Sequence, residues 1–357
     1  MKGAVIGCGR MGAFTSESMA KFAPRCWFPL SHAEAIRMHP DLDLVALCDP
    51  NELSLKRAAE AYGVGNIYTD YRDLIEDAKP ELIGIATRTL GRAEIIRCAA
   101  AGGVRAMHIE KPLCNTMREL QALTQTFANS DLYCSYGAIR RFFKIYQVAR
   151  ELAHSGKYGD LREIRVNMGE GMLYWTHPHS VDLILYFAGA QRAEAIQARL
   201  RNVVRGESPL EIASDPIIES ASIYFEDGIA GHITGASGYA VILSCSGAEI
   251  AVENDGQSIS ISAPRGENPY FCTSAYQGTY NTPQSEGTYA PISHLVGCLA
   301  GDDAQRSSNV KLKADILRGQ RILFAIVQSH LEQSRLVREQ DIDPEIAILA
   351  KTGEKFA

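Results

Sequence analysis

The sequence predicts two domains, an α/β domain with a parallel sheet followed by an α+β domain with a mainly antiparallel sheet. Up to about residue 137, short apolar runs alternate with segments of helical periodicity, which is typical of a parallel sheet covered by helices. From about residue 161, apolar and polar residues alternate, as in strands with one exposed face. The length of 357 residues also suits two domains. We therefore expect domains at residues 1–137 and 138–357.

The composition excludes several classes of protein. The net charge is −6, so no basic footprint for nucleic acid is present. No apolar run reaches the length of a membrane span, and the N-terminus has no signal-peptide layout. The nine cysteines form no CxxC pair, which argues against a zinc site or a redox pair. We expect a cytoplasmic protein with reduced thiols, no metal, and neither a nucleic-acid nor a membrane partner.

The elements of the first domain each follow from a local signal. The strands are continuous apolar runs, as expected when helices cover both faces of a sheet. The helices repeat apolar residues with a period near 3.6, and Gly102-Gly103 stops one of them. The expected strands are residues 4–6, 42–48, 82–86, 104–109 and 132–136, and the expected helices are residues 53–62, 71–77, 92–101 and 117–128.

A glycine pattern connects the first strand to the chain that follows it. The strand runs directly into Gly7-x-Gly9-x-x-Gly12, the spacing of a dinucleotide-binding turn. Gly7 permits the tight turn, Gly9 lets the backbone approach a pyrophosphate, and Gly12 lets the next helix pack closely on the strand. The free N–H groups at the start of that helix attract phosphate oxygens. We therefore predict a Rossmann domain that binds a nicotinamide dinucleotide.

The second strand ends in Asp49, whose carboxylate can accept both hydroxyls of an adenosine ribose. In Asp49-Pro50-Asn51 no arginine directly follows the carboxylate. A 2′-phosphate would be repelled there, so we expect NAD rather than NADP.

Asp49 lies much farther past the glycines than the usual ~20 residues. The excess contains Pro24 and Pro29, which cannot lie inside a helix. We expect an inserted loop, followed by a helix at about residues 32–38 that is capped by Ser31. The loop lies either near the nicotinamide end of the cleft or against its own domain.

The second domain begins with an expected amphipathic helix at residues 142–154. Turn signals such as Asp227-Gly228 and Ser246-Gly247 separate its strands. A polar stretch at residues 265–291 predicts a long ordered loop, and an apolar stripe predicts a C-terminal helix at about residues 314–335. The expected strands are residues 163–167, 219–225, 229–234, 240–244, 249–252 and 258–262.

A second informative stretch places two histidines at the start of a helix. Pro178 suits the first turn of that helix and Gly189 its end. His179 and Asp182 are three residues apart and so share a face. A histidine in this position can act as a general base near neutral pH, and a structural histidine is the alternative. Asp182 either orients His179 or pairs locally, and His177 is near enough for the two histidines to exchange roles.

Two basic motifs complete the candidate site. A buried strand ends in Glu110-Lys111-Pro112, and the carboxyl ends of parallel strands are where α/β proteins bind ligands. Arg140 and Arg141 can hold a carboxylate or phosphate of a substrate, or they form ion pairs within the protein.

These motifs together resemble the Gfo/Idh/MocA family of sugar-type oxidoreductases, named for glucose–fructose oxidoreductase and inositol dehydrogenase. The resemblance covers nearly the whole chain and rests on the combination of motifs in one order. The motifs are Gly7-Cys8-Gly9-Arg10-Met11-Gly12, Cys48-Asp49, Ala86-Thr87, Glu110-Lys111-Pro112, Arg140-Arg141-Phe142, Gly156-Lys157-Tyr158-Gly159 and His179-Ser180-Val181-Asp182.

The resemblance implies an NAD-dependent oxidoreductase acting on the CH–OH group of a sugar, sugar derivative or polyol. By this likeness His179 removes the hydroxyl proton, and Lys111 donates a hydrogen bond to the same oxygen and stabilises the developing alkoxide. The family's open-faced sheet pairs subunits, which implies a homodimer or homotetramer. The implied cofactor contacts are Gly7, Cys8, Gly9, Arg10, Met11, Gly12, Asp49, Pro50, Thr87, Arg88, Glu110 and Lys111.

The sequence departs from the family at three positions. Trp175 stands where the family often has an aspartate, four residues before the catalytic histidine, so a proton relay through that carboxylate is not available. The indole can stack on the apolar face of a sugar or lie in the core. Arg88 and Arg92 also replace residue types that are common in the family, which puts the details of nicotinamide contact in doubt.

Two alternatives remain open at this level. A redox-assisted lyase, hydrolase or epimerase would oxidise its sugar transiently and retain its cofactor, so that NADH never accumulates. A non-catalytic sensor would bind NAD and a sugar without turnover. The presence of both Lys111 and His179 favours an enzyme over a sensor.

Overall fold

The computed structural model describes residues 1–189, 192–263, 275–276 and 286–350. The described residues form two compact units. The first contains residues 1–139 and 286–317, and the second contains residues 140–263, 275–276 and 318–350, apart from 190–191. Whether residues 1–137 fold as an independent domain, with 138–357 as the other, stays a prediction.

The first unit is built on a six-stranded sheet in which every neighbouring pair is parallel. Its strand order, β3-β2-β1-β4-β5-β6, reverses direction at β1, as in the Rossmann fold. The predicted fold class of this unit is therefore confirmed. The strands are β1 (Lys2–Ile6), β2 (Asp43–Cys48), β3 (Ile67–Tyr68), β4 (Leu82–Ile85), β5 (Ala106–Ile109) and β6 (Tyr133–Tyr136).

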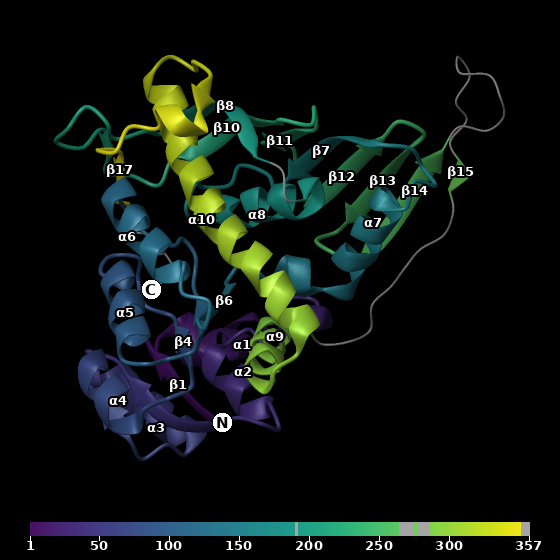
Figure 1. Cartoon of the computed structure of the whole chain (residues 1–357). Coiled ribbons are helices and arrows are strands. Elements are labelled where there is room, and N and C mark those ends of the chain that lie inside the picture. The colour runs from purple at the N-terminus through teal and green to yellow at the C-terminus, as the bar shows by residue number, and fades with distance from the viewer. Residues whose placement is uncertain (190–191, 264–274, 277–285, 351–357) are drawn as a thin grey trace. The chain divides into compact units, whose positions relative to one another are not determined.

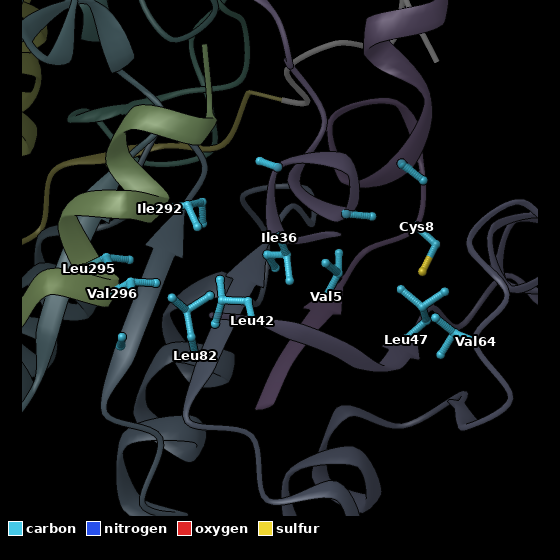
Figure 2. Packing of buried hydrophobic residues seen from close by; sticks show 14 of the residues in the cluster. Val5, Cys8, Ile36, Leu42, Leu47, Val64, Leu82, Ile292, Leu295 and Val296 are labelled. Carbon is cyan, nitrogen blue, oxygen red and sulfur yellow. The ribbon is translucent and has the colours of Figure 1, made fainter. Parts of the chain in front are cut away.

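Helices cover both faces of this sheet (Figure 1). On one face a buried apolar cluster joins α2, α3 and α9 to the strands, and Ile36, Leu47 and Leu295 belong to it (Figure 2). Helices α4, α5 and α6 lie in a row on the other face. The helices of this unit are α1 (Thr15–Met19), α2 (His32–Met38), α3 (Glu52–Tyr62), α4 (Tyr71–Ala78), α5 (Arg92–Ala101), α6 (Met117–Phe127) and α9 (Tyr289–Ala300).

The predicted insertion is closed at its base by two serines. Ser16 Oγ accepts hydrogen bonds from the backbone N–H groups of Leu30, at 2.9 Å, and Ser31, at 3.2 Å. Ser31 is the N-cap residue of α2 as predicted, but its Oγ accepts from Ser16 N at 3.2 Å instead of capping the helix. The two ends of the segment therefore meet, and residues 20–30, which follow α1, form a loop between α1 and α2.

The insertion contacts the segment before α9, which belongs to the same unit. Cys26 O accepts the N–H groups of Glu286 and Gly287 at 3.0 and 3.1 Å. Thr288 donates its N–H to Pro29 O at 2.6 Å and its hydroxyl to Leu30 O at 2.8 Å. The segment before α9 is thus hydrogen bonded to the insertion.

The second unit contains a nine-stranded sheet among the described residues, in the order β15-β14-β13-β12-β7-β11-β10-β8-β16. Its pairs are antiparallel except β7 with β11, which confirms the open, mainly antiparallel sheet. The strands are β7 (Leu161–Asn167), β8 (Ala193–Arg201), β10 (Ile217–Phe225), β11 (Ala230–Thr234), β12 (Ala240–Cys245), β13 (Ala248–Glu253), β14 (Ser258–Ala263), β15 (Ala275–Tyr276) and β16 (Val337–Arg338), and β9 (Glu211–Ile212) pairs with β17 (Ala347–Ile348) separately.

Helices α7 (Lys144–His154) and α8 (His177–Ala188) pack on the sheet of the second unit. Helix α10 (Asp303–Leu331) begins earlier than the predicted residue 314, because Asp302 Oδ1 accepts the Gln305 N–H at 3.0 Å and starts the helix there. The loop expected at residues 265–291 lies largely outside the described residues, and its last part is the start of α9. In the described parts of the chain, no helix combines the length and apolarity that crossing a bilayer requires.

Candidate dinucleotide and hydride-transfer site

The predicted cofactor residues of the first unit lie at one edge of its sheet. Four neighbouring parallel strands, β2, β1, β4 and β5, end immediately before Asp49, Gly7, Ala86 and Glu110. Backbone hydrogen bonds hold these ends together: Gly7 N donates to Cys48 O at 2.8 Å, and Glu110 N donates to Ile85 O at 2.9 Å. The structure therefore brings together the residues that the sequence placed in the cofactor site.

The glycine turn has the geometry that the sequence motif requires. Gly7 has φ of 95°, where a side chain is strained. A Cβ on Gly12 would lie 1.7 Å from the Gly7 carbonyl oxygen, whereas a Cβ on Gly9 would meet nothing within 4 Å. Gly12 is thus needed for close packing of the π-helical turn Arg10–Phe14 that precedes α1, and Gly9 leaves open space for a ligand to approach the backbone.

Asp49 is held in place by the same turn. Its Oδ2 accepts the Cys8 N–H at 2.7 Å, and its Oδ1 accepts the Asn51 N–H at 2.8 Å. Each carboxylate oxygen has a further lone pair to offer, and Asp49 is only half-buried. The Cys8 thiol is no reactive group, because burial together with the Asp49 and Cys48 side chains raises its pKa to about 12.

Other predicted cofactor residues differ in exposure. Arg10 and Met11 are half-buried, and Pro50 and Arg88 are exposed. Thr87 Oγ1 is buried without a hydrogen-bond partner among the described residues. A buried hydroxyl without a partner is costly, and at this edge of the sheet it suits contact with a bound polar ligand.

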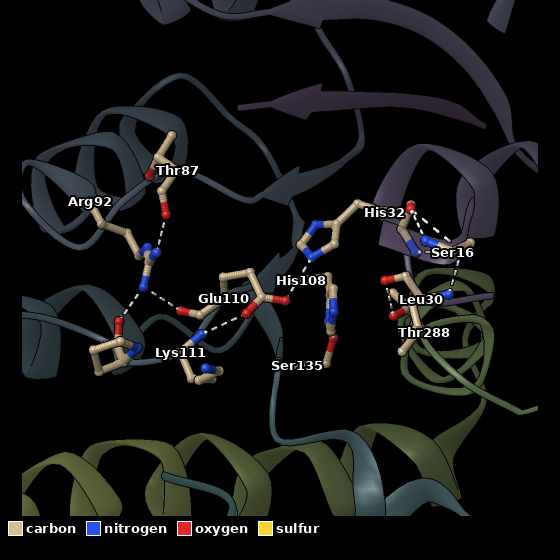
Figure 3. A network of polar contacts seen from close by, with 12 residues as sticks. Ser16, Leu30, His32, Thr87, Arg92, His108, Glu110, Lys111, Ser135 and Thr288 are labelled. Atoms are coloured by element: carbon tan, nitrogen blue, oxygen red, sulfur yellow. Dashed lines mark hydrogen bonds and ion pairs between the residues drawn. The ribbon is translucent and has the colours of Figure 1, made fainter. Parts of the chain in front are cut away.

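The Glu110-Lys111-Pro112 turn is held from its backbone side by Arg92 (Figure 3). This side chain is 2% exposed. One guanidinium nitrogen donates to Glu110 O at 2.7 Å and to Pro112 O, and the other donates to Thr87 O. Arg92 therefore ties the end of β4 to both residues that flank Lys111, and Lys111 itself is half-buried.

The Glu110 side chain lies in a buried polar cluster with His32 and His108. Its burial raises the carboxyl pKa, but the hydrogen bond and charge of His32, with the charge of Lys111, bring that pKa down to about 2. His32 Nε2 lies 3.1 Å from Glu110 Oε1, and His108 Nδ1 lies 2.9 Å from Ser135 Oγ. Burial, with the neighbouring His32, lowers the His108 pKa to about 3.

His32, His108 and Glu110 are the one group of metal-ligand type that lies close enough together among the described residues, with potential ligand atoms within 4.8 Å of one another. Their types suit zinc. A divalent cation here would face only one carboxylate in a buried region that already holds the Arg92 guanidinium, and uncompensated buried charge is costly. The expectation of no metal stays a prediction, and the charge balance favours it.

In the second unit, the two histidines at the start of α8 differ sharply. His177 is fully buried, with Nδ1 3.0 Å from Ser180 Oγ and Nε2 3.1 Å from Gly171 O. Burial lowers its pKa to about 4, although the Gly171 carbonyl partly opposes this. His179 is half-buried. Of the two, His179 is therefore the better candidate for contact with a substrate.

The predicted acidic and basic residues near α8 form ion pairs in the second unit. Arg141 bonds both carboxylate oxygens of Asp182, at 2.8 and 2.9 Å, and Arg140 bonds Asp255 at 2.6 and 2.8 Å. Both arginines are nearly buried, and Asp255 holds the Arg140 pKa above its usual range against the effect of burial. This geometry favours the ion-pair alternative, and substrate contact by these residues stays a prediction.

Trp175 is half-buried, and its backbone is anchored by an aspartate from another segment. Asp215 accepts the N–H groups of Tyr174 and Trp175, at 2.6 and 3.0 Å. Tyr174 is buried, and its hydroxyl accepts from Gln320 at 2.9 Å. The loop that leads into α8 is therefore held by Asp215 at the backbone of Tyr174 and Trp175 and by Gln320 at the Tyr174 side chain.

Sequence reasoning missed the contacts of His32 and Arg92. His32 was expected only as the first residue of a capped helix, and Arg92 as the first residue of another helix and as a departure from the family. For His32, the signal in the sequence was its place on the apolar side of a predicted helix, beside Ala35 and Ile36 in His32-Ala33-x-Ala35-Ile36. A histidine there needs a buried partner, but the sequence does not say which.

Comparison with known proteins agrees with this fold. Residues 1–138 match the family model described as "Oxidoreductase family, NAD-binding Rossmann fold" (GFO_IDH_MocA). The match includes the glycine turn, Asp49 and the Glu110-Lys111-Pro112 turn. Over these residues the chain is therefore similar to the Gfo/Idh/MocA oxidoreductases, and the resemblance found in the sequence is confirmed for this part of the chain.

Curated relatives are distant and match part of the chain. Myo-inositol 2-dehydrogenase of Thermotoga maritima is 26% identical over 166 residues, 46% of this chain and 44% of that enzyme. The scyllo-inositol 2-dehydrogenase (NAD(+)) of Bacillus subtilis is 24% identical over 156 residues, 44% of this chain and 41% of that enzyme. The chain thus matches less than half the length of each.

Solved structures share the fold over almost the whole chain. An inositol dehydrogenase homologue from Azotobacter vinelandii, complexed with NADH and myo-inositol, has a TM-score of 0.72 at 17% identity, covering 95% of this chain and 97% of that one. Levoglucosan dehydrogenase, in complex with NADH and levoglucosan, has a TM-score of 0.67 at 18% identity, covering 95% and 99%. At these identities the likeness establishes the fold alone.

Proposed function

We propose that this protein is an NAD-dependent oxidoreductase that transfers a hydride between nicotinamide and the CH–OH carbon of a sugar, sugar derivative or polyol. The observation that carries the proposal is the convergence of the glycine turn, the Asp49 carboxylate and Lys111 at one edge of a parallel sheet. This is the edge at which such sheets bind dinucleotides. The match of residues 1–138 to the oxidoreductase family model and the names of the inositol dehydrogenases support the reaction class.

The residues at this edge fit the dinucleotide. Backbone around Gly9 would receive the pyrophosphate, because no side chain fills the space there. Asp49, fixed by Cys8 and Asn51, would accept the adenosine ribose hydroxyls and repel a 2′-phosphate. When bound, NAD supplies the hydride acceptor. Thr87 Oγ1 is a candidate partner for a polar group of the same ligand.

Lys111 and His179 have different roles at the substrate hydroxyl in this proposal. The ammonium of Lys111 donates a hydrogen bond to the substrate oxygen and stabilises negative charge as it develops there. The imidazole of His179 accepts the hydroxyl proton. Lys111 belongs to the first unit and His179 to the second, so their meeting in one site is part of the proposal. Asp182, already bonded to Arg141, acts on the position of α8 rather than as a proton acceptor.

Two further features belong to the proposal. Trp175 offers an aromatic surface to the apolar face of a ring-shaped polyol. The outer face of the open sheet pairs two copies of the chain, giving a homodimer or homotetramer, as the family resemblance implies.

A substrate screen tests the proposed function. The purified protein is incubated with NAD⁺ and, separately, with myo-inositol, scyllo-inositol, levoglucosan, free sugars, sugar acids and nucleotide-sugars, and NADH absorbance is followed. Accumulation of NADH with one of these classes, abolished in Lys111→Met, supports a dehydrogenase. Turnover of a sugar without NADH, by protein that retains its cofactor through purification, would contradict it and point to internal redox chemistry.

A further inference from the structure

One buried carboxylate connects helix α2 to the backbone of Lys111. Glu110 Oε1 lies 3.1 Å from His32 Nε2, and Glu110 Oε2 accepts the Lys111 N–H at 3.2 Å. Figure 3 shows the three residues in this order, with His32 projecting from α2 toward the end of β5. An ionised carboxylate only accepts hydrogen bonds, so the His32 Nε2 carries the hydrogen.

The fold leaves space for this contact by using glycine at two positions, one within a strand and one directly after a strand. A Cβ on Gly84, in β4, would lie 2.7 Å from His32 Nδ1 and 3.1 Å from its Cβ. A Cβ on Gly137, directly after β6, would lie 2.7 Å from Glu110 Oε2. Any larger residue at either position would displace the imidazole or the carboxylate. The His32–Glu110 contact is therefore built into the sheet rather than formed by chance at a surface.

The contact with Glu110 is the one hydrogen bond that the His32 imidazole makes among the described residues. His32 is fully buried, and its Nδ1 has no hydrogen-bond partner among the described residues. Its ring lies against that of His108, with centroids 4.6 Å apart. A buried polar side chain with one partner is costly, so its strong hydrogen bond to Glu110 is the contact that compensates for burial.

The backbone on both sides of Lys111 is fixed at the same time. Arg92 holds the carbonyl oxygens of Glu110 and Pro112, and the Glu110 carboxylate holds the N–H of Lys111. These contacts hold the backbone on both sides of the Lys111 Cα. Among them, only the one from the carboxylate depends on a side chain of α2.

We propose that His32 is a positioning residue, which acts through the Glu110 carboxylate to fix the backbone of Lys111 and so sets where the lysine ammonium meets the substrate. The effect on turnover rests on the proposed function of Lys111, whereas the effect on the backbone does not.

The first test measures amide hydrogen exchange at Lys111 in the full chain without ligands. His32→Leu keeps the volume and removes the donor, and we expect exchange at Lys111 to be about tenfold faster, the scale of one lost hydrogen bond. His32→Gln keeps an N–H donor and should restore exchange to within about threefold of wild type. His39→Leu is the matched control, because His39 is the C-cap residue of the same helix and its ring contacts the Asp41 N–H and the Tyr289 ring.

Unchanged exchange at Lys111 in His32→Leu would overturn the proposal. Should that variant fail to fold, Glu110→Gln replaces it, since the neutral amide is a weaker acceptor for the Lys111 N–H. Unchanged exchange there would overturn the proposal equally.

The second test separates positioning from general stability in the reaction. With NAD⁺ and the substrate found in the screen, or myo-inositol as the first probe, kcat should fall about tenfold or more in His32→Leu. The Kd for NAD⁺ should stay within about threefold, and His32→Gln should recover kcat. Equal loss in the Leu and Gln variants would contradict a positioning role. If wild type turns over nothing while the exchange result holds, the proposed function fails and the positioning role stands.

Discussion

Replacing Asp49 by alanine tests the cofactor assignment, and its effect can be estimated from the contacts of the carboxylate. Asp49 accepts two backbone N–H groups, at 2.7 Å from Cys8 and 2.8 Å from Asn51, which aims its remaining lone pairs away from the turn. A hydrogen bond to a charged group contributes about 1.5–3 kcal/mol. Loss of the ribose contact should therefore raise the Kd for NAD⁺ by about 10- to 150-fold.

The same substitution also has a cost that does not involve the ligand. Cys8 is fully buried, so its N–H would lose its partner at about 1–3 kcal/mol of folding stability. Isothermal calorimetry measures the NAD⁺ affinity, and denaturant unfolding measures the stability. Asp43→Ala is the matched control, because Asp43 is exposed at the opposite end of the same strand and should leave the Kd unchanged.

Two outcomes of this experiment would refute the reasoning. If Asp49→Ala loses stability but binds NAD⁺ as wild type does, the carboxylate serves only to hold the glycine turn. If Asp49→Asn, which removes the charge and keeps the size, leaves the preference for NAD⁺ over NADP⁺ unchanged, repulsion of a 2′-phosphate is not what selects the cofactor.

Three further predictions concern other parts of the site. Gly12→Ala places a Cβ 1.7 Å from the Gly7 oxygen, and overpacking should cost about 1–3 kcal/mol or more in denaturant unfolding, with weaker NAD⁺ binding; wild-type stability would contradict the close packing. Lys111→Met should lower kcat by about 10²–10⁴ with NAD⁺ affinity nearly unchanged, and undiminished turnover would remove Lys111 from the mechanism. Burial lowers the His177 pKa to about 4 in the folded chain, whereas in the unfolded chain it is about 6.5. The unfolded chain therefore takes up the proton first as the pH falls, so the folding stability that is present above about pH 6.5 decreases between pH 6.5 and pH 4. His177→Gln should remove about 3 kcal/mol of this acid sensitivity, and an unchanged pH profile of unfolding would argue against it.

The sequence predicted much of the first unit because its signals are local. Apolar runs marked the strands, and each strand was followed directly by the residue expected at its end, such as Asp49 or Glu110. The order of parallel strands then brought these ends to one edge, as the Rossmann topology requires. Helix α2 was also predicted with its observed bounds.

Other features depend on distant contacts and were not predictable in this way. Helix α9 was not expected, and its first three residues were assigned to the polar loop that ended at Pro291; proline is tolerated in a first helical turn. Its position depends on hydrogen bonds with the insertion. Strand β8 was not expected, although Ile196, Ala198 and Leu200 alternate inward. The partners of His32 and Arg92 come from other strands and turns, which no local pattern specifies.

A crystal structure of the protein with NAD⁺ tests the central claim most directly. We expect the pyrophosphate against the backbone of Gly9, the adenosine ribose on the Asp49 carboxylate, and the nicotinamide ring beside both Lys111 and His179. A nicotinamide ring far from these two side chains would contradict the account, even with the adenosine bound as expected.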